Sequence, residues 1–450
     1  MLTTKQIKET FIDFFTNRDH TKINESSLIP QNDDSLLFTN SGMVQFKNIF
    51  LGYEEPTYNK VTNAQICIRA GGKHNDLDDV GKDSYHHTLF TMLGNWSFNY
   101  KQEAENKSYF KKEAIDMAWE LLINVFKLPI ENIYVTYFGG TIDNNLLEDT
   151  ETKELWLRYL PGDKILPFGM KDNFWQMAET GPCGPCTEIH FDRKGNRDAS
   201  QLVNKDDPTV IEIWNLVFMQ FNRLPTHLEQ LASCHVDTGA GLERLASILQ
   251  NTTNYQTDEF KLIINIIQTV CNSPDYADLY QKDDPIYTNT AYRVISDHLR
   301  TMIYAIKDGC KPSGTSRGHV IRRVIRRAIR YGTKLNAPDG FLSKCALDLM
   351  ESWELSNKLL LEVETKNNIL TTIQEEETKF SKSMKKGLKY FNKLLKKGIN
   401  ILTGKDAFLL NSTYGFPVDI IKQIVEENDI QLDLLELEKL MADHVLTSKK

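Results

Sequence analysis

The chain has 450 residues, 25% of them charged, and a formal net charge of −8. This length predicts two or three domains, and the negative charge excludes a globally basic nucleic-acid-binding protein, so that any such contact must be a local patch. The sequence has no run of about eighteen apolar residues and no apolar signal core at its amino end, which argues against a membrane span and a signal peptide. Seven cysteines, an odd number, are spread thinly along it. We therefore expect free thiols in a reducing compartment, the cytosol, with an organelle matrix as the alternative.

The chain divides into two parts with different sequence patterns, which together predict an α+β protein. Up to about residue 255, β-rich runs alternate with glycine, proline and asparagine, and after it long helical periods dominate. We expect a first domain over residues 1–255 and a mostly α-helical domain over residues 256–450. In chain order, the expected elements are a helix near 7–15, a strand at 66–68, an apolar run at 86–98, a helix at 103–126, strands at 132–138 and 210–221, and helices at 259–271, 291–308, 317–331, 342–353, 357–395 and 435–450.

An arginine stands at the end of the expected strand at 66–68. Arg69 is followed by a loop that contains two glycines and Lys73. The guanidinium group is a planar fork of donors that suits phosphate oxygens, and Phe90 in the next apolar run could offer a flat face to an adenine ring. The alternative is a surface hairpin with a salt-bridged arginine and core aromatics.

A second arginine follows a tight turn. The segment Asp237–Arg244 reads as a strand end, a slim turn with Gly239 and Gly241, and a helix start. A helix amino terminus favours an anion. Arg69 and Arg244 could therefore bind the two ends of one triphosphate, with Arg244 at such a terminus. Neither segment is a phosphate-binding loop or a dinucleotide-binding glycine motif. The alternative is a plain glycine turn before a core helix.

The most basic stretch of this acidic chain is residues 311–334, which contains no acidic residue. At about 100° per residue, the aliphatic side chains fall on one half of a helix and five arginines on the other: Arg322, Arg323, Arg326, Arg327 and Arg330. This pattern favours contact with a nucleic-acid backbone. The alternative is a helix that forms ion pairs with acids such as Asp297 or Asp308.

Together these segments resemble motifs 2 and 3 of the class II aminoacyl-tRNA synthetases, and longer strings resemble the alanyl-tRNA synthetase family. The resemblance extends to about Asp419 and is specific, because several unusual strings occur in the family's order. They are residues 38–43, 69–77, 172–177, 181–188, 213–221 and 317–323.

The resemblance implies a fold, a reaction and its cofactors. It implies a class II antiparallel β-sheet flanked by helices, followed by a helical domain that recognises the tRNA acceptor stem. The implied reaction is ATP-dependent attachment of alanine to tRNA(Ala) through alanyl-adenylate, with Mg²⁺ and without a protein nucleophile. Two rivals are a catalytically silent RNA-binding relative and an enzyme that makes an aminoacyl-adenylate for a non-tRNA acceptor.

The resemblance also assigns residues to the site. Arg69 and Arg244 match positions at the α- and γ-phosphates, and Lys73 is expected to neutralise developing charge, unless it is a solvated loop lysine. Asp237 matches a position that pairs with the ammonium of alanine, with a turn cap as the alternative. The expected ATP contacts are Arg69, His87, Phe90, Trp175, Ile213, Trp214, Asn215, Gly241 and Arg244, and the expected alanine contacts are Asn215, Asp237, Trp175 and Val217.

The expected tRNA contacts are Gly314, Arg317, Arg322, Arg323, Arg326, Arg327 and Asp419. Most family members carry asparagine where this chain has Gly314, and that asparagine helps to read a G·U pair in the acceptor stem. Glycine has no side chain that could hydrogen-bond a base edge, so we expect weaker selection of that pair.

Two further features bear on metals and on the family's other domains. Cys183 and Cys186 form a C-x-x-C pair near His190, but no second spaced pair follows, and the family's zinc belongs to its editing region, so zinc is not expected. No H-x-x-x-H signature occurs. We therefore expect no editing of mischarged tRNA by this chain, and a monomer.

Overall fold

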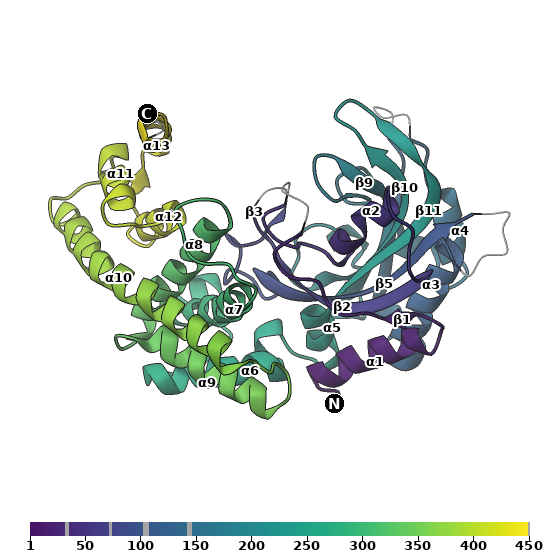
Figure 1. Ribbon diagram of the computed structural model, residues 1–450, viewed down its shortest axis with the longest axis horizontal. Coiled ribbons are helices and arrows are strands. Elements are labelled where there is room, and N and C mark those ends of the chain that lie inside the picture. Colours follow the sequence, from purple (N-terminus) through teal and green to yellow (C-terminus); the bar gives the residue numbers. More distant parts are fainter. Residues whose placement is uncertain (32–35, 72–73, 102–107, 142–145, 449–450) are drawn as a thin grey trace. The chain divides into compact units, whose positions relative to one another are not determined.

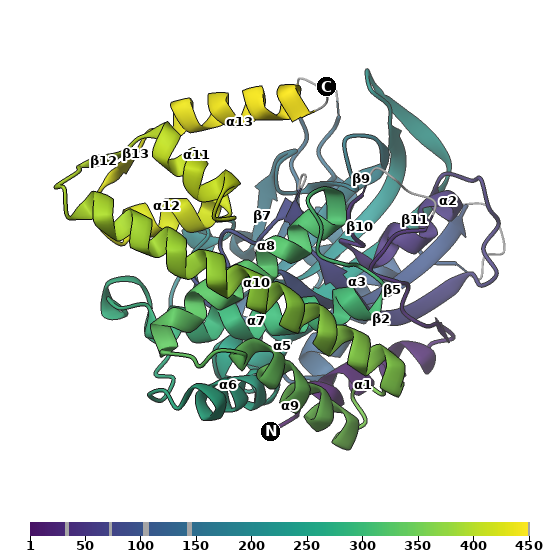
Figure 2. The same ribbon diagram turned by 60° about the vertical axis from the view of Figure 1, so that its left-hand side comes forward.

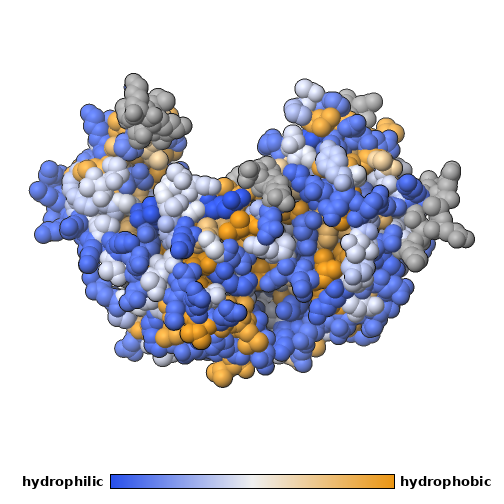
Figure 3. All heavy atoms as spheres, viewed as in Figure 1, coloured by the Kyte–Doolittle hydropathy of each residue, from blue (hydrophilic) through white to orange (hydrophobic). Residues whose placement is uncertain are grey.

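The computed structural model describes residues 1–31, 36–71, 74–101, 108–141 and 146–448. The chain divides into two compact units, each described by itself. The first comprises Met1–Asn75 and Asp83–Lys261, and the second Asp76–Lys82 and Leu262–Lys450. The first unit thus extends past residue 255, and a short segment inside its sequence belongs to the second. Within the described ranges, no helix is long and apolar enough to cross a bilayer, and hydrophilic side chains cover most of the face in Figure 3.

One mostly antiparallel sheet forms the centre of the first unit (Figure 1). Its strand order is β1-β2-β5-β11-β10-β9-β6-β7, with β8 paired to β9, and only β1/β2 and β6/β7 among the described pairs in this sheet are parallel. The strands are β1 Thr21–Lys22, β2 Lys60–Ile68, β5 Leu89–Tyr100, β6 Ile133–Phe138, β7 Ile165–Phe168, β8 Phe174–Gln176, β9 Gly181–Asp192, β10 Val210–Arg223 and β11 Leu228–Gly241. A separate antiparallel pair joins β3 Ala70–Gly71 to β4 His74–Asn75.

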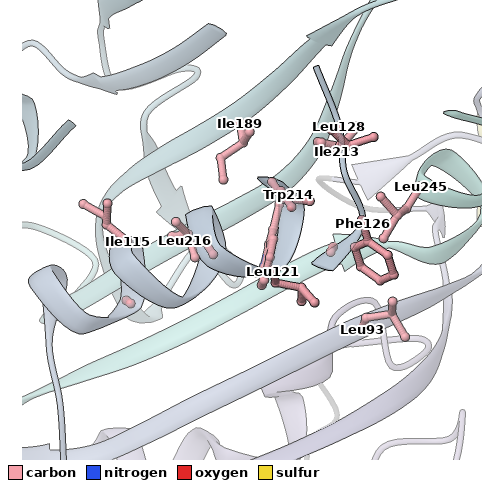
Figure 4. Packing of buried hydrophobic residues seen from close by; sticks show 14 of the residues in the cluster. Leu93, Ile115, Leu121, Phe126, Leu128, Ile189, Ile213, Trp214, Leu216 and Leu245 are labelled. Carbon is pink, nitrogen blue, oxygen red and sulfur yellow. The ribbon is translucent and has the colours of Figure 1, made fainter. Parts of the chain in front are cut away.

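Helices cover one face of this sheet and enclose the larger apolar core (Figure 4). Side chains from α1, α3 and α5 pack there against alternate residues of the strands, because successive side chains of a strand point to opposite faces. The helix expected at 103–126 begins only at Lys111, and residues 103–107 lie outside the described residues. The helices are α1 Thr4–Thr16, α2 Lys47–Phe50, α3 Lys111–Trp119 with a π-helical continuation Glu120–Val125, α4 Thr150–Trp156 and α5 Leu242–Leu249.

The opposite face of the sheet carries a smaller cluster, which leaves room for polar groups. Met43, Phe46 and Phe50 pack there against Trp96 on β5 and Val217 on β10. The side chains that line the cavity described below project from this face.

The second unit is helical, and α7 lies at its centre. Every residue from Asn289 to Ile306 of α7 is buried, and α10 packs along α7, α8 and α9 (Figure 2). The sheet and this helical unit together confirm the predicted α+β class. The helices are α6 Asp258–Cys271, whose residues up to Lys261 belong to the first unit, α7 Thr288–Lys307, α8 Ser316–Gly332, α9 Phe341–Leu355, α10 Val363–Leu395, α11 Gly404–Ser412, α12 Val418–Glu426 and α13 Leu434–Ser448, and β12 Ile401–Leu402 pairs with β13 Gln431–Leu432.

Candidate active site

A cavity of about 630 Å³ opens on the less covered face of the sheet in the first unit. Its wall includes cationic, anionic, amide and apolar side chains, so it can meet a ligand that carries both signs of charge. The lining residues are Ser41, Arg69, Met92, Met170, Lys171, Asp172, Phe174, Trp175, Gln176, Glu188, Glu212, Asn215, Val217, Asp237 and Gly239.

The register of neighbouring strands brings the polar residues together. Asp237 on β11 lies directly opposite Val217 on β10 and Trp96 on β5, and Asn215 on β10 lies opposite Glu188 on β9. Side chains two residues apart on a strand share a face, so Asn215 and Val217 both point to the cavity. The floor of the cavity is therefore built from rigid central strands.

Asp237 is the most deeply buried carboxylate of this wall. The residue is 5% exposed, and its Oδ1 accepts a hydrogen bond of 2.6 Å from Nε1 of Trp96. Burial raises the pKa of Asp237 to about 7, and the bond from Trp96 opposes that rise. A cationic ligand beside Asp237 would restore the charged form.

Asn215 is held in place by Glu188. Its Nδ2 donates to Oε1 of Glu188 at 3.3 Å, which leaves the amide carbonyl as the acceptor for a ligand. Oε2 of Glu188 lies 3.2 Å from Nε2 of His190 and accepts from Asn204 at 3.1 Å. Burial raises the pKa of Glu188, and the negative charge of Glu212 raises it further, against the hydrogen bond from His190.

Arg69 extends from the end of β2 into the same cavity. Its Nε donates to the backbone carbonyl of Asn40 at 3.3 Å, and its guanidinium carbon lies 4.9 Å from the centre of the Phe90 ring. The carbonyl and the ring hold the guanidinium plane at a cavity rich in carboxylates. The structure thus brings Arg69, Asn215, Asp237, Trp175 and Val217 to one site.

Arg244 is linked to this site because it bonds to an acidic residue that lines the cavity, Glu212. It lies in the first turn of α5, and its Nη1 donates to the backbone carbonyl of Glu212 at 3.0 Å and to Oε2 of Glu212 at 3.2 Å. Glu212 itself lines the cavity. Gly241 is the residue before α5, and a Cβ atom there would lie 3.5 Å from the Arg244 side chain.

Other expected ATP contacts lie elsewhere in the first unit. The Ile213 and Trp214 side chains are buried in the core on the helix-covered face (Figure 4), because a register shift between Glu212 and Trp214 changes the alternation of β10. The His87 ring stacks on Phe260 at 4.9 Å, away from the cavity lining. Lys73 lies outside the described residues.

Glu188 and Glu212 are cavity residues that sequence reasoning did not assign. A strict alternation along β10 would place Glu212 with Trp214, away from Asn215, and the register shift reverses this. A string that contains Glu188 was singled out, so the signal was present, although the role of the carboxylate was not recognised. Met92 and Gly239 approach each other across the strands, and a Cβ at Gly239 would come within 2.8 Å of the Met92 sulfur.

The arginines of α8 form ion pairs within the second unit. Arg323 contacts Asp419 at 2.8 Å and also Asp78, and Arg327 contacts Asp419 at 3.4 Å. Arg326 contacts Glu376 and Arg330 contacts Glu427, both at 2.7 Å. These partners are remote in sequence, and they differ from the acids considered above, Asp297 and Asp308.

The expected tRNA residues differ in exposure. The side chains of Arg322, Arg323 and Arg326 are 31%, 22% and 19% exposed, whereas that of Arg327 is 7% exposed. Arg317 lies in the first turn of α8, and Gly314 lies in the loop before it, where a Cβ would be 3.9 Å from Nη1 of Arg322.

The C-x-x-C pair lies within strand β9. Cys183 packs with Phe138 and Phe174, and Cys186 belongs to the cluster that contains Val217, so the two thiols enter different clusters. Burial raises the pKa of the Cys186 thiol well above its ordinary value. In the part of the chain that the structure describes, no group of three or more His, Cys, Asp or Glu residues could hold a metal ion.

Comparison with known proteins assigns this chain to one family. The sequence model of the family described as "tRNA synthetases class II (A)" matches residues 6–450. A relative named "Alanine--tRNA ligase, cytoplasmic" from Dictyostelium discoideum is 49% identical over 447 residues, 97% of this chain and 46% of the relative. The protein of the same name from Bombyx mori is 46% identical over 460 residues, 100% of this chain and 46% of the relative.

A mitochondrial form is also similar. The "Alanine--tRNA ligase, mitochondrial" of Saccharomyces cerevisiae is 44% identical over 463 residues, 100% of this chain and 46% of the relative. The chain spans about half the length of the curated relatives it matches.

Proposed function

Because the chain belongs to the class II tRNA synthetase (A) family, we propose that it activates alanine with ATP and transfers the alanyl group to tRNA(Ala). The observation that carries this proposal is the single cavity that contains Arg69, Asn215, Val217 and Asp237. Relatives named as alanine–tRNA ligases support the choice of amino acid.

The alanine subsite is proposed at the buried end of the cavity. The ionised carboxylate of Asp237 pairs with the ammonium group, and the Asn215 carbonyl, oriented through Glu188, accepts a second hydrogen bond from it. Trp175 and Val217 bound the space for one methyl group. A larger aliphatic side chain would clash with these walls, and a missing methyl would leave a gap.

The ATP subsite is proposed between the two arginines. Arg69 binds the α-phosphate and Phe90, which already contacts Arg69, offers its ring to adenine. Arg244 exchanges its bond with Glu212 for one with the γ-phosphate, next to Gly241 in the turn before α5. In this arrangement His87, Ile213 and Trp214 support the subsite through packing and backbone, and Lys73 contributes positive charge.

The chemistry needs no protein nucleophile. The alanine carboxylate attacks the α-phosphorus of ATP and pyrophosphate leaves. A tRNA 3′-terminal hydroxyl then attacks the activated carbonyl and loses its proton, and AMP leaves as the mixed anhydride bond breaks. Arg69 stabilises charge that develops at the α-phosphate. Asp237 and Asn215 bind the ammonium group of alanine and thereby keep its carboxylate in line for attack. Positioning and preorganised charge supply the rate enhancement.

Mg²⁺ fits the acidic residues of the wall. It prefers carboxylate oxygens and is commonly bound by one or two carboxylates together with phosphates. Glu188 and Glu212 line the same cavity, and the repulsion that raises the pKa of Glu188 comes in part from Glu212. These two carboxylates would hold the ion, which supplies charge neutralisation at the phosphates.

For tRNA we propose contacts from the more exposed half of α8. Arg317, Arg322, Arg323 and Arg326 are placed at the acceptor-stem backbone, with Arg327 and Asp419 joined behind them. Gly314 contributes backbone alone. Internal ion pairs reduce the net charge that these arginines present, so the affinity should depend on few of them.

The proposed reaction takes place in the cytosol, with an organelle matrix as the alternative, and relatives with both kinds of name match the chain. All lining residues of the cavity come from one unit of one chain. A monomer would therefore suffice for adenylate formation.

Exchange of labelled pyrophosphate into ATP tests the first step, and attachment of labelled alanine to tRNA(Ala) tests the second. We expect alanine-dependent exchange and transfer, with much weaker exchange for glycine or serine. A chain that supports neither reaction would be a silent relative, and exchange without transfer to tRNA would indicate a different acceptor.

A further inference from the structure

Trp96 lies beneath the proposed alanine subsite and cannot turn away from it. It is fully buried on β5, and its ring lies 5.0 Å from that of Phe46. Two glycines make room for the indole. A Cβ at Gly42 would come within 2.6 Å of it, and a Cβ at Gly94 would overlap it outright. The close approach of Gly42, Gly94 and Phe46 therefore holds the plane of the ring.

The fixed ring directs its single donor at Asp237. The two residues are direct partners in the pairing of β5 and β11, so their side chains leave the sheet side by side on the same face. The indole Nε1 donates to Oδ1 of Asp237 at 2.6 Å, a short bond to a charged acceptor. With Oδ1 engaged by the indole, Oδ2 is the oxygen that remains for a ligand in the cavity.

We propose that Trp96 is a positioning residue for alanine activation: its N–H orients and helps to ionise the Asp237 carboxylate that receives the ammonium group of alanine. This inference rests on the proposed function. The alternative role, that of a space-filling core residue, needs only the ring and does not need the N–H.

The N–H has a measurable electrostatic effect. Burial raises the pKa of Asp237 to about 7, and the Trp96 bond opposes the rise. Other titratable groups around Asp237 are Arg69, Lys171, Asp172, Glu188 and Glu212 in the same wall, and the Cys67 thiol on β2, whose pKa is affected by Asp237. Loss of the N–H alone leaves all of these in place and raises the pKa of Asp237.

The variant Trp96→Phe keeps an aromatic ring and removes the donor. Trp156→Phe is the matched control, because Trp156 is also fully buried and its Nε1 donates to Thr187 at 2.8 Å, outside the cavity lining. Alanine-dependent pyrophosphate exchange is measured for both at about pH 6 and about pH 9, on either side of the Asp237 pKa of about 7.

We expect Trp96→Phe to raise the KM for alanine by about tenfold at the lower pH, because the pKa of Asp237 rises by about one unit. At the higher pH Asp237 is ionised in both proteins, so the KM of the variant should return close to the native value. The KM for ATP should stay unchanged, and Trp156→Phe should show the same pH dependence of the KM for alanine as the native protein. Equal effects at both pH values, or equal effects of the two variants, would overturn the proposal.

A measurement on the native protein covers the case in which the variant does not fold. The chain has six tryptophans, and with ¹⁵N-labelled indoles the Trp96 resonance should show the largest change as Asp237 titrates near pH 7 and should move again when alanine binds. If no indole resonance titrates there, the proposal fails. Absence of exchange at any pH, with a titrating indole, would instead refute the proposed function alone.

Discussion

Asp237 shows how a binding residue can oppose the stability of the fold that holds it. A carboxylate removed from water without a cation beside it is destabilised in its charged form, and only Trp96 among the bonds described for it offsets this. This destabilisation of the charged carboxylate favours ligand binding, because a bound ammonium group relieves it. The same carboxylate on the surface would attract alanine far less.

The variant Asp237→Asn should therefore lose activity and gain stability. Alanine-dependent exchange should fall by at least about 100-fold, as expected when one partner of a buried charge pair is removed. The folded-state pKa of about 7 lies above the ordinary value of 3.8, so ionisation of Asp237 destabilises the native protein progressively as pH rises between these values. The Tm advantage of the variant should grow over that window and level off above it.

Asp192 provides the control with the opposite sign. Burial would raise its pKa, but the bond from Arg197 prevails and lowers it. Asp192→Asn should therefore lower Tm at neutral pH, with the loss disappearing in acid as the native carboxylate is protonated. An Asp237→Asn variant that behaved like Asp192→Asn would contradict the interpretation of Asp237.

At the scale of single residues, the sequence predicted which residue types occur together better than the face of the strand to which each side chain points. Asn215, Val217 and Asp237 were expected at one site, and their side chains line one cavity, because they follow the regular alternation of β10 and β11. A strict alternation along β10 would place Ile213 on the cavity face with Asn215 and Glu212 on the core face, and the register shift between Glu212 and Trp214 exchanges these two. A one-residue irregularity leaves no mark in composition or spacing, so only the structure reveals it.

Helix α8 illustrates the limits of pattern reading at the scale of an element. The periodicity of residues 317–331 predicted a helix with aliphatic and arginine halves, and the structure confirms the helix as Ser316–Gly332. The absence of acids nearby in sequence suggested unpaired charge. Tertiary packing supplies Asp78, Glu376, Asp419 and Glu427 from three segments that are remote in sequence, and no local pattern could foresee them.

The ion pair between Arg330 and Glu427 at the end of α8 should stabilise the fold. The side chains of Arg330 and Glu427 are only 7% and 8% exposed, so Arg330→Met should lower the free energy of unfolding by about 3 kcal/mol, since it leaves a buried carboxylate with fewer partners. Urea denaturation followed by circular dichroism measures the change. The matched control Lys379→Met breaks an exposed pair with Glu375 and should change the value by less than about 0.5 kcal/mol. Similar losses in both variants would refute a special role for burial.

At the scale of the whole molecule, the proposed recognition of tRNA involves Gly314, a position without a side chain. Gly314 has room for a larger residue, since the nearest atom to a Cβ there is Nη1 of Arg322 at 3.9 Å. We expect the native chain to charge tRNA(Ala) with and without the acceptor-stem G·U pair at rates within about tenfold, because a base contact that contributes about 1–3 kcal/mol of discrimination is missing.

The variant Gly314→Asn offers the converse test. Its side-chain amide could reach a base edge, and the preference for the G·U tRNA should increase by about tenfold, measured as the ratio of kcat/KM for the two tRNAs. Pyrophosphate exchange without tRNA should not change. Strong preference for the G·U pair in the native chain, or none in the variant, would show that another residue reads this pair.

The short segment Asp76–Lys82 has a consequence for any attempt to take the protein apart. It follows the Arg69 loop in sequence but belongs to the helical unit, where Arg323, Arg327 and Arg293 bond to Asp78, Val80 and Gly81. The polypeptide therefore passes from one unit to the other three times, and a fragment that starts at Leu262 would lack three anchoring partners of its own helices. No single cut of the backbone yields two intact halves.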